Sequence, residues 1–253
     1  PQTPNPKPLI LLSFIVPILE NPSVGCTKSI MSSFGYNCII FGSSGAVGTE
    51  VAKQLSQNPK WSRVFLCVRK ATAETEALRQ NPKFRIVECP NTVDEALIEG
   101  QVGGERIDAV FNFLGSRVKF GEATFTLVDK TLVLNSAGLA QKLGARVFAH
   151  VSSKGVDATS KFLYLRVKGE AAQELKNYPL PNLHLFKPGL LTHRKDARFM
   201  EKVFGFIPFV PKIQVPLLAD RIIAAAQNAL DRNERTGYTV FEHNQILNLP
   251  PTA

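Results

Sequence analysis

Tyr164 and Lys168 are the residues whose types and spacing point most directly to acid–base chemistry. Residues four apart share one face of a helix, so the lysine ammonium would lie beside the phenol. A positive charge there favours release of the phenolic proton, so the tyrosine can donate or take the proton that accompanies hydride transfer. The ammonium can also hydrogen-bond to the ribose of a nicotinamide cofactor. Because such a pair also arises readily by chance in a lysine-rich chain, its interpretation depends on its position.

Two serines, Ser152 and Ser153, follow an apolar run upstream of that pair, and Tyr164 comes eleven residues after Ser153. A hydroxyl group at the end of a strand can polarise a substrate carbonyl while the tyrosine supplies its proton. Because side chains alternate along a strand, we expect Ser153 to face the site and its neighbour to face away. The alternative is an ordinary capping hydroxyl for the following turn.

A glycine-rich segment, GSSGAVG at residues 42–48, follows an apolar run and precedes an amphipathic helical pattern. The N–H groups at a helix N-terminus bind pyrophosphate, so this context predicts a dinucleotide-binding turn. Gly42 would permit the tight turn, Gly45 would let the backbone approach the phosphates, and Gly48 would let the helix pack against the strand. The alternative is a turn that only joins strand to helix.

Two cations, Arg69 and Lys70, end the next apolar run. An acidic residue at this place would hydrogen-bond to the adenosine ribose hydroxyls and favour NAD. Cations can instead pair with a 2′-phosphate, and the Arg69 guanidinium can stack on adenine. The segment therefore predicts NADP(H) as the cofactor, with a pair of solvated surface charges as the alternative.

The elements that must position these residues form an alternating pattern. From residue 36 onward, short apolar β-branched runs alternate with helical patterns, which is typical of βαβ units. We expect an α/β fold over residues 31–253: a single Rossmann-type doubly wound parallel sheet with helices on both faces and a ligand crevice at the carboxyl ends of its strands. The expected strands are residues 36–41, 63–68, 84–88, 108–114, 146–151 and 183–186, and the expected later helices are 128–143, 162–175 and 217–230.

Composition narrows the range of partners. The chain has 253 residues, of which 44% are hydrophobic, and a formal net charge of +9. A basic surface suits a polyanionic ligand or an anionic membrane, and since no nucleic-acid-binding motif accompanies it, no nucleic acid partner is expected. The cysteines lack close CxxC spacing and are interpreted as reduced core thiols of an intracellular protein. The scattered histidines form no metal-ligand set, so no metal is expected.

Two segments leave their roles open. Residues 1–30 hold one apolar run, residues 9–19, which is too short to span a bilayer as a helix. They are interpreted as an N-terminal extension or as a targeting or membrane-associating arm. A later segment is first basic and then aromatic, and it could form a pocket wall, a membrane-touching patch or a partner surface. Its residues are Arg194, Lys195, Arg198, Lys202 and the run 204–211.

Taken together, these motifs resemble those of short-chain dehydrogenases/reductases of the extended or atypical kind. The chain is similar in particular to the Tat-interacting-protein oxidoreductase group, whose fungal relatives are mitochondrial outer-membrane proteins. The match runs from residue 36 to residue 248. It is carried by GSSGAVG (42–48), CVRK (67–70), FLG (113–115), VSSKGVD (151–157), KFLYLRVKGE (161–170) and FKPGLL (186–191).

The resemblance implies a role for each matched residue. It places Ser44, Gly45, Ala46 and Val47 along the pyrophosphate, Arg69 and Lys70 at the adenosine phosphate, Leu114 and Gly115 beside the nicotinamide ribose, and Tyr164 with Lys168 at the proton transfer. One departure concerns the catalytic asparagine of the ordinary enzymes, because the NNAG segment that closes their fourth strand is replaced here by NFLG. Asn135 is available, but we expect it on a helix surface.

These features predict an NADP(H)-dependent oxidoreductase that acts on a small-molecule carbonyl or alcohol, with Tyr164, Lys168 and Ser153 as catalytic residues. Two alternatives stay open. One is an NADP(H)-binding regulatory protein that works through protein partners. The other is an accessory subunit of a larger assembly, in peripheral contact with a mitochondrial membrane. The expected location is cytoplasmic or mitochondrial, the outer membrane surface included.

Overall fold

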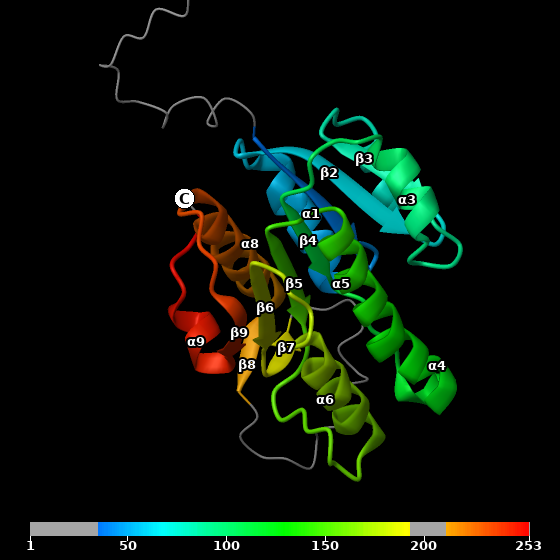
Figure 1. Ribbon diagram of the computed structural model, residues 1–253, viewed down its shortest axis with the longest axis vertical. Helices are drawn as coiled ribbons and strands as arrows, with labels where there is room; N and C mark the ends of the chain where they lie inside the picture. Colours follow the sequence, from blue (N-terminus) through cyan, green and yellow to red (C-terminus); the bar gives the residue numbers. More distant parts are fainter. Residues whose placement is uncertain (1–34, 193–210, 253) are drawn as a thin grey trace, which may run out of the picture. The chain divides into compact units, whose positions relative to one another are not determined.

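A parallel sheet forms the centre of the protein. The computed structural model describes residues 35–192 and 211–252, all of which belong to one compact unit (Figure 1). The main sheet has seven strands within these residues, in the order β3-β2-β1-β4-β5-β6-β9, and every neighbouring pair is parallel. The strands are β1 (Tyr36–Phe41), β2 (Trp61–Val68), β3 (Phe84–Glu88), β4 (Ala109–Asn112), β5 (Val147–Val151), β6 (Asn182–Lys187) and β9 (Gly237–Glu242).

The central strands are predominantly apolar because helices cover both faces of the sheet. In β1, Cys38 and Ile40 point into one core, whereas Ile39 and Phe41 point into the other. Strand side chains alternate between faces, so an unbroken apolar run is what a sheet buried on both sides requires. This arrangement leaves the ends of the strands as the place where polar chemistry can be located.

The helices divide between the two faces. Side chains of α1 and α8 pack into the core that contains Cys38, whereas those of α3, α5 and α6 pack into the core that contains Ile39. Within the described residues the α-helices are α1 (Ala46–Gln57), α2 (Ala73–Leu78), α3 (Glu95–Val102), α4 (Glu122–Thr126), α5 (Leu132–Lys142), α6 (Leu163–Leu175), α8 (Val215–Asp231) and α9 (His243–Asn248). The single Rossmann-type doubly wound sheet expected from the sequence is therefore confirmed.

One helix is longer and less regular than its sequence pattern indicated. The expected helix 128–143 begins earlier, at Glu122, and runs through α4, the π-helical turn η2 (Leu127–Thr131) and α5. Figure 1 shows α4 and α5 continuing one another. A π turn inside an α-helix holds one more residue than a regular turn and is frequent at functional sites.

Other differences lie at the sheet edge and near the site. Strand β9 was not expected, since its side chains are mostly half-buried and, among the described strands, it pairs with β6 alone. A small parallel pair, β7 (Leu190–Thr192) with β8 (Lys212–Gln214), was also missed because each strand is too short to show a pattern. Strand β4 ends at Asn112, two residues before the expected end, and this places Phe113 and Leu114 beyond the strand.

Other expectations concern the cysteines and two segments of the chain. Cys38, Cys67 and Cys89 are buried free thiols, as the sequence suggested. Residues 1–30 and the basic and aromatic segment up to residue 210 lie outside the described residues. Among the described helices, none combines the length and apolar character that a membrane crossing requires.

Two buried histidines couple the stability of the sheet to pH. Burial lowers the pKa of His184 from 6.5 to about 4. Its ring lies against two aromatic rings, with centroids 6.4 Å from Phe186 and 5.3 Å from Phe241. Burial, and next the charge of Lys168, lower the pKa of His150 to about 3. Because the unfolded chain binds these protons at higher pH than the folded chain, this stability is complete above pH 6.5 and is lost as the pH falls toward 4 and below.

We predict that the free energy of unfolding falls as the pH is lowered from about 7 to about 5, and that His184→Leu reduces this fall by about 2 kcal/mol. Urea unfolding of wild type and variant at both pH values measures the difference. Equal falls in the two proteins would show that His184 is not held neutral by its burial.

Candidate functional site

A cavity of about 700 Å³ lies where the carboxyl ends of the central strands meet. Its walls come from the segments after β1, β4, β5 and β6, together with α6 and residues near α2. This is the place where ligands bind in open parallel α/β sheets. The cavity brings together most of the residues that the sequence singled out: Ser44, Gly45, Ala46, Val47, Leu114, Gly115, Ser153, Tyr164 and Lys168.

Gly42 and Gly48 shape the glycine turn from behind rather than lining the cavity. Gly42 has a φ of +76°, and a side chain there would bring its Cβ 2.6 Å from the carbonyl carbon of Phe113. A Cβ on Gly48 would collide with the Gly42 carbonyl oxygen and lie 2.8 Å from the Cα of Ser43. Gly48 is therefore needed for contact between the helix and the turn itself, whereas contact with the strand was expected. Gly42 thus lets the turn lie against the segment after β4, and Gly48 lets α1 lie against the turn.

The start of α1 offers backbone N–H groups to the cavity. Gly45 is the N-cap residue and supplies no side-chain cap, and the first turn of the helix has no acidic residue. The N–H of Gly45 donates to the Gly42 carbonyl at 3.0 Å. Ser43, which also lines the cavity, has a buried hydroxyl without a hydrogen-bond partner among the described residues. Uncapped N–H groups and an orphaned hydroxyl at a helix N-terminus fit an anionic group such as a pyrophosphate.

The two cations at the end of β2 do not line the cavity. Arg69 and Lys70 are exposed, and neither contributes to the cavity wall. On that side the wall is formed by Thr72, Glu74, Thr75 and Leu78 from the N-terminal cap and body of α2. A ligand would have to extend past these residues to reach the two cations.

Tyr164 and Lys168 lie on one face of α6, as their spacing predicted. The Lys168 Nζ is 5.6 Å from the centroid of the Tyr164 ring, and both residues line the cavity. The Tyr164 ring also contacts Phe125 of α4, with centroids 5.8 Å apart. Gly169, the next residue, allows α6 to lie directly on the preceding loop, because a Cβ there would collide with the backbone of Asp157 and Ala158.

Both serines after β5 line the cavity. The strand ends at Val151, so Ser152 and Ser153 lie beyond it and strand alternation does not separate them. The Ser152 hydroxyl is buried and has no hydrogen-bond partner among the described residues. Ser153 is half-buried, and its hydroxyl donates to the Lys154 carbonyl at 3.4 Å. Of the two hydroxyls, that of Ser153 is the one open to a ligand in the cavity.

Asp129 was missed by the sequence reasoning, although it is the carboxylate most closely tied to the site. It lies in η2, is fully buried, lines the cavity and has its Oδ1 2.7 Å from the Lys168 Nζ. Its Oδ2 accepts hydrogen bonds from the Ser116 backbone N–H at 2.7 Å and hydroxyl at 2.8 Å. The sequence did contain an indication of this role. Asp129 is three and four residues before the buried Leu132 and Val133, so helical spacing places a charged residue on an apolar helix face.

Neither Asn112 nor Asn135 lines the cavity. Asn112, at the end of β4, accepts a hydrogen bond from the Leu114 N–H at 3.0 Å and donates to the Ser136 hydroxyl. The backbone carbonyl oxygen of Asn112 lies 3.2 Å from the His150 Nδ1. Asn135 is exposed on α5 and does not line the cavity, as expected of a helix-surface residue.

Sequence comparison identifies relatives along most of the chain, although no family model matches it. Rat protein HTATIP2 is 31% identical over 218 residues, which are 83% of this chain and 87% of the relative. The mitochondrial protein FMP52 of Lodderomyces elongisporus is 29% identical over 171 residues, covering 66% of this chain and 70% of the relative.

Solved structures share the fold. The Bordetella bronchiseptica enzyme WbmH, in complex with NAD⁺, aligns with a TM-score of 0.59 at 20% identity over 76% of this chain and 73% of its own. The Helicobacter pylori ADP-L-glycero-D-manno-heptose-6-epimerase aligns with a TM-score of 0.62 at 12% identity over 83% and 76%. At these identities the likeness concerns the fold alone.

We predict that Gly48→Ala destabilises the protein by about 1–3 kcal/mol, because its Cβ collides with backbone that cannot move independently. Gly100→Ala is the matched control, since Gly100 also lies in a helix and has nothing within 4 Å of an added Cβ. This control should be neutral or stabilise by roughly 0.5–1 kcal/mol. Urea unfolding compares the two, and equal effects would contradict the tight turn.

Proposed function

Because the chain belongs to the HTATIP2-like group of atypical short-chain dehydrogenases/reductases, we propose that it is an NADP(H)-dependent oxidoreductase that interconverts a carbonyl and an alcohol. The observation that carries this proposal is the meeting of two features in one cavity. An uncapped helix N-terminus follows the glycine turn at one wall, and Tyr164, Lys168 and two serines form another.

The residues of the cavity fit a dinucleotide. Residues 44–47 would hold the pyrophosphate through backbone N–H groups, and Leu114 and Gly115 would lie beside the nicotinamide ribose. The cofactor, when bound, supplies or accepts the hydride. The NAD⁺ complex of WbmH, which has the same fold, supports a nicotinamide cofactor for this chain.

The preference for NADP(H) over NAD(H) rests on charge at the end of β2. Arg69 and Lys70 would pair with the 2′-phosphate, and this ester carries the charge that distinguishes the two cofactors. Glu74 lies on the same side of the cavity and opposes a phosphate there, but the two cations outnumber it. The guanidinium and ammonium groups are exposed, so they can reorient toward a ligand that extends past Thr72.

Tyr164 handles the proton in the proposed reaction. In reduction its O–H donates a proton to the substrate carbonyl oxygen, and in oxidation its phenolate takes a proton from the alcohol. The Lys168 ammonium stabilises the phenolate charge and hydrogen-bonds to the nicotinamide ribose. Ser153 would donate a hydrogen bond to the same carbonyl oxygen and orient it.

A second candidate is an NADP(H)-binding regulatory protein or accessory subunit with little turnover. It is favoured because the ordinary short-chain enzymes use a catalytic asparagine, whereas no asparagine is found among the described residues that line this cavity. Such a protein would act through protein partners. The mitochondrial names of its fungal relatives support a mitochondrial location for this chain, with peripheral contact at the outer membrane surface as part of the proposal.

Replacing both Arg69 and Lys70 with serine should raise the Kd for NADPH at least about tenfold, because two charge-assisted hydrogen bonds to the 2′-phosphate are lost. The Kd for NADH should change less than about twofold, since NADH lacks that phosphate. Fluorescence titration measures both values, with Lys176→Ser as a control that removes an exposed cation at the far end of α6. Equal loss for the two cofactors would overturn the assignment of the 2′-phosphate site.

Tyr164→Phe should bind NADPH as tightly as the wild type but lose turnover by about 10²–10⁴-fold, because the phenol supplies the proton and not the cofactor affinity. Steady-state rates on a panel of aldehydes and ketones test this. Turnover that survives in the variant would contradict the role of Tyr164. Tight NADPH binding without turnover by either protein would instead favour the second candidate.

A further inference from the structure

Asp129 occupies an unusual place for a carboxylate. It lies in the π-helical turn η2, in the middle of the long helix that runs from α4 to α5, and it is fully buried. A buried carboxylate is strongly destabilising unless it is paired and hydrogen-bonded. The burial of the Asp129 carboxylate therefore depends on the groups that it contacts.

Its ion pair and its hydrogen bonds both join residues that line the cavity. Oδ1 lies 2.7 Å from the Lys168 Nζ, and Lys168 is itself only 7% exposed. Oδ2 accepts two hydrogen bonds from Ser116, which follows β4 and also lines the cavity. The carboxylate thus links the segment after β4 to the face of α6 that carries Tyr164 and Lys168.

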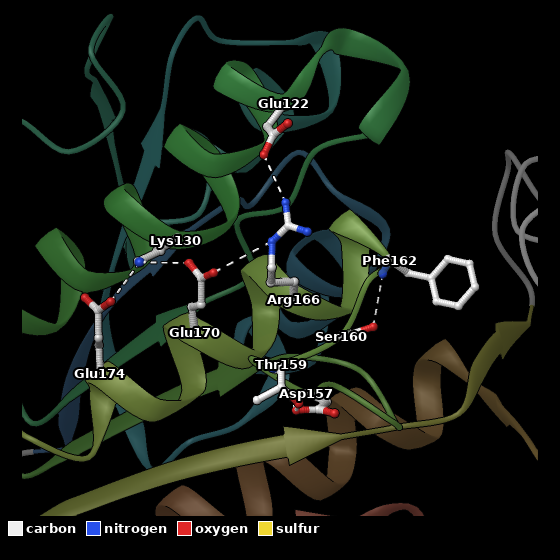
Figure 2. A network of polar contacts seen from close by, with 9 residues as sticks. All are labelled: Glu122, Lys130, Asp157, Thr159, Ser160, Phe162, Arg166, Glu170 and Glu174. Atoms are coloured by element: carbon white, nitrogen blue, oxygen red, sulfur yellow. Dashed lines mark hydrogen bonds and ion pairs between the residues drawn. The ribbon is translucent and has the colours of Figure 1, made fainter.

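Half-buried and exposed ion pairs also join the same helices. Lys130, the next residue of η2, lies 2.9 Å from Glu170 and 2.7 Å from Glu174 of α6 (Figure 2). Arg166 of α6 lies 3.0 Å from Glu122 of α4, at the other end of this network. The helices are therefore held together without Asp129, and its burial on the inner side calls for a different role.

We propose that Asp129 is the positioning residue of Lys168: its carboxylate fixes the ammonium group at the cavity wall, in charged form, beside Tyr164. This inference rests on the proposed function, because it assigns the fixed ammonium to the nicotinamide ribose and the tyrosine. A buried ammonium without a carboxylate partner loses its charge or turns toward water. Because an ammonium group has three N–H donors, a bond to Asp129 sets its place without exhausting its capacity to donate.

The test is nucleotide binding by Asp129→Asn, which removes the charge and keeps the shape. Two probes are compared by titration: NADPH, and adenosine 2′,5′-bisphosphate, which lacks the nicotinamide ribose. The Kd for NADPH should rise about tenfold, because an ammonium group without its ion-pair partner no longer keeps its place at the nicotinamide ribose, while the Kd for the bisphosphate stays unchanged. Lys130→Met, which breaks the outer ion pairs of the same helices, is the matched control and should leave both values unchanged.

A double variant shows whether Asp129 acts through Lys168. In a Lys168→Met background, Asp129→Asn should have no further effect on the Kd for NADPH. If Asp129→Asn does not fold, Asp129→Glu replaces it, since the longer side chain keeps the charge but misplaces it, and the same selective loss is expected.

The outcomes separate the two proposals. Equal weakening of both probes by the Asp129 variants, or an undiminished effect in the Lys168→Met background, would overturn the positioning role while leaving the proposed function intact. A wild-type protein that does not bind NADPH would overturn both.

Discussion

The site depends on the close approach of two backbone segments at the carboxyl end of β1. Gly42, with its positive φ, lies against the backbone of Phe113, and Gly48 lies against the carbonyl of Gly42. No residue with a side chain fits either place without displacing backbone. This packing directs the N-terminus of α1 and the segment after β4 into the same cavity, and so it defines the space in which a ligand can lie.

At the cavity wall that contains Lys168 and Asp129, the structure is constrained by the burial of two charged groups. Lys168 and Asp129 are both removed from water and lie 2.7 Å apart, so each compensates the other. The π turn brings the carboxylate to that position, and Gly169 lets α6 lie close enough to the β5–α6 loop to hold the lysine there. The Lys168–Asp129 pair therefore depends on the packing of two helical segments, whereas the glycine turn is encoded by one local segment.

This difference explains what the sequence could and could not predict. The glycine turn, most strands of the sheet and the Tyr164–Lys168 pair were predictable because each is encoded by residues close together in the chain. Asp129 was not found, because its partners Ser116 and Lys168 are distant in sequence and meet only after α6 packs on η2. Strand alternation led us to expect Ser152 to face away from the site, but alternation does not apply because β5 ends at Val151, before both serines. Strand β9 was missed because an edge strand with half-buried side chains lacks a strong apolar pattern.

The most direct test of this account is a crystal structure of the protein with NADP⁺. We expect the pyrophosphate on the N–H groups of residues 45–47, the 2′-phosphate between Arg69 and Lys70, and the nicotinamide ribose within hydrogen-bonding distance of Tyr164 and Lys168. A dinucleotide bound outside this cavity, or one whose nicotinamide lies away from Tyr164, would contradict it.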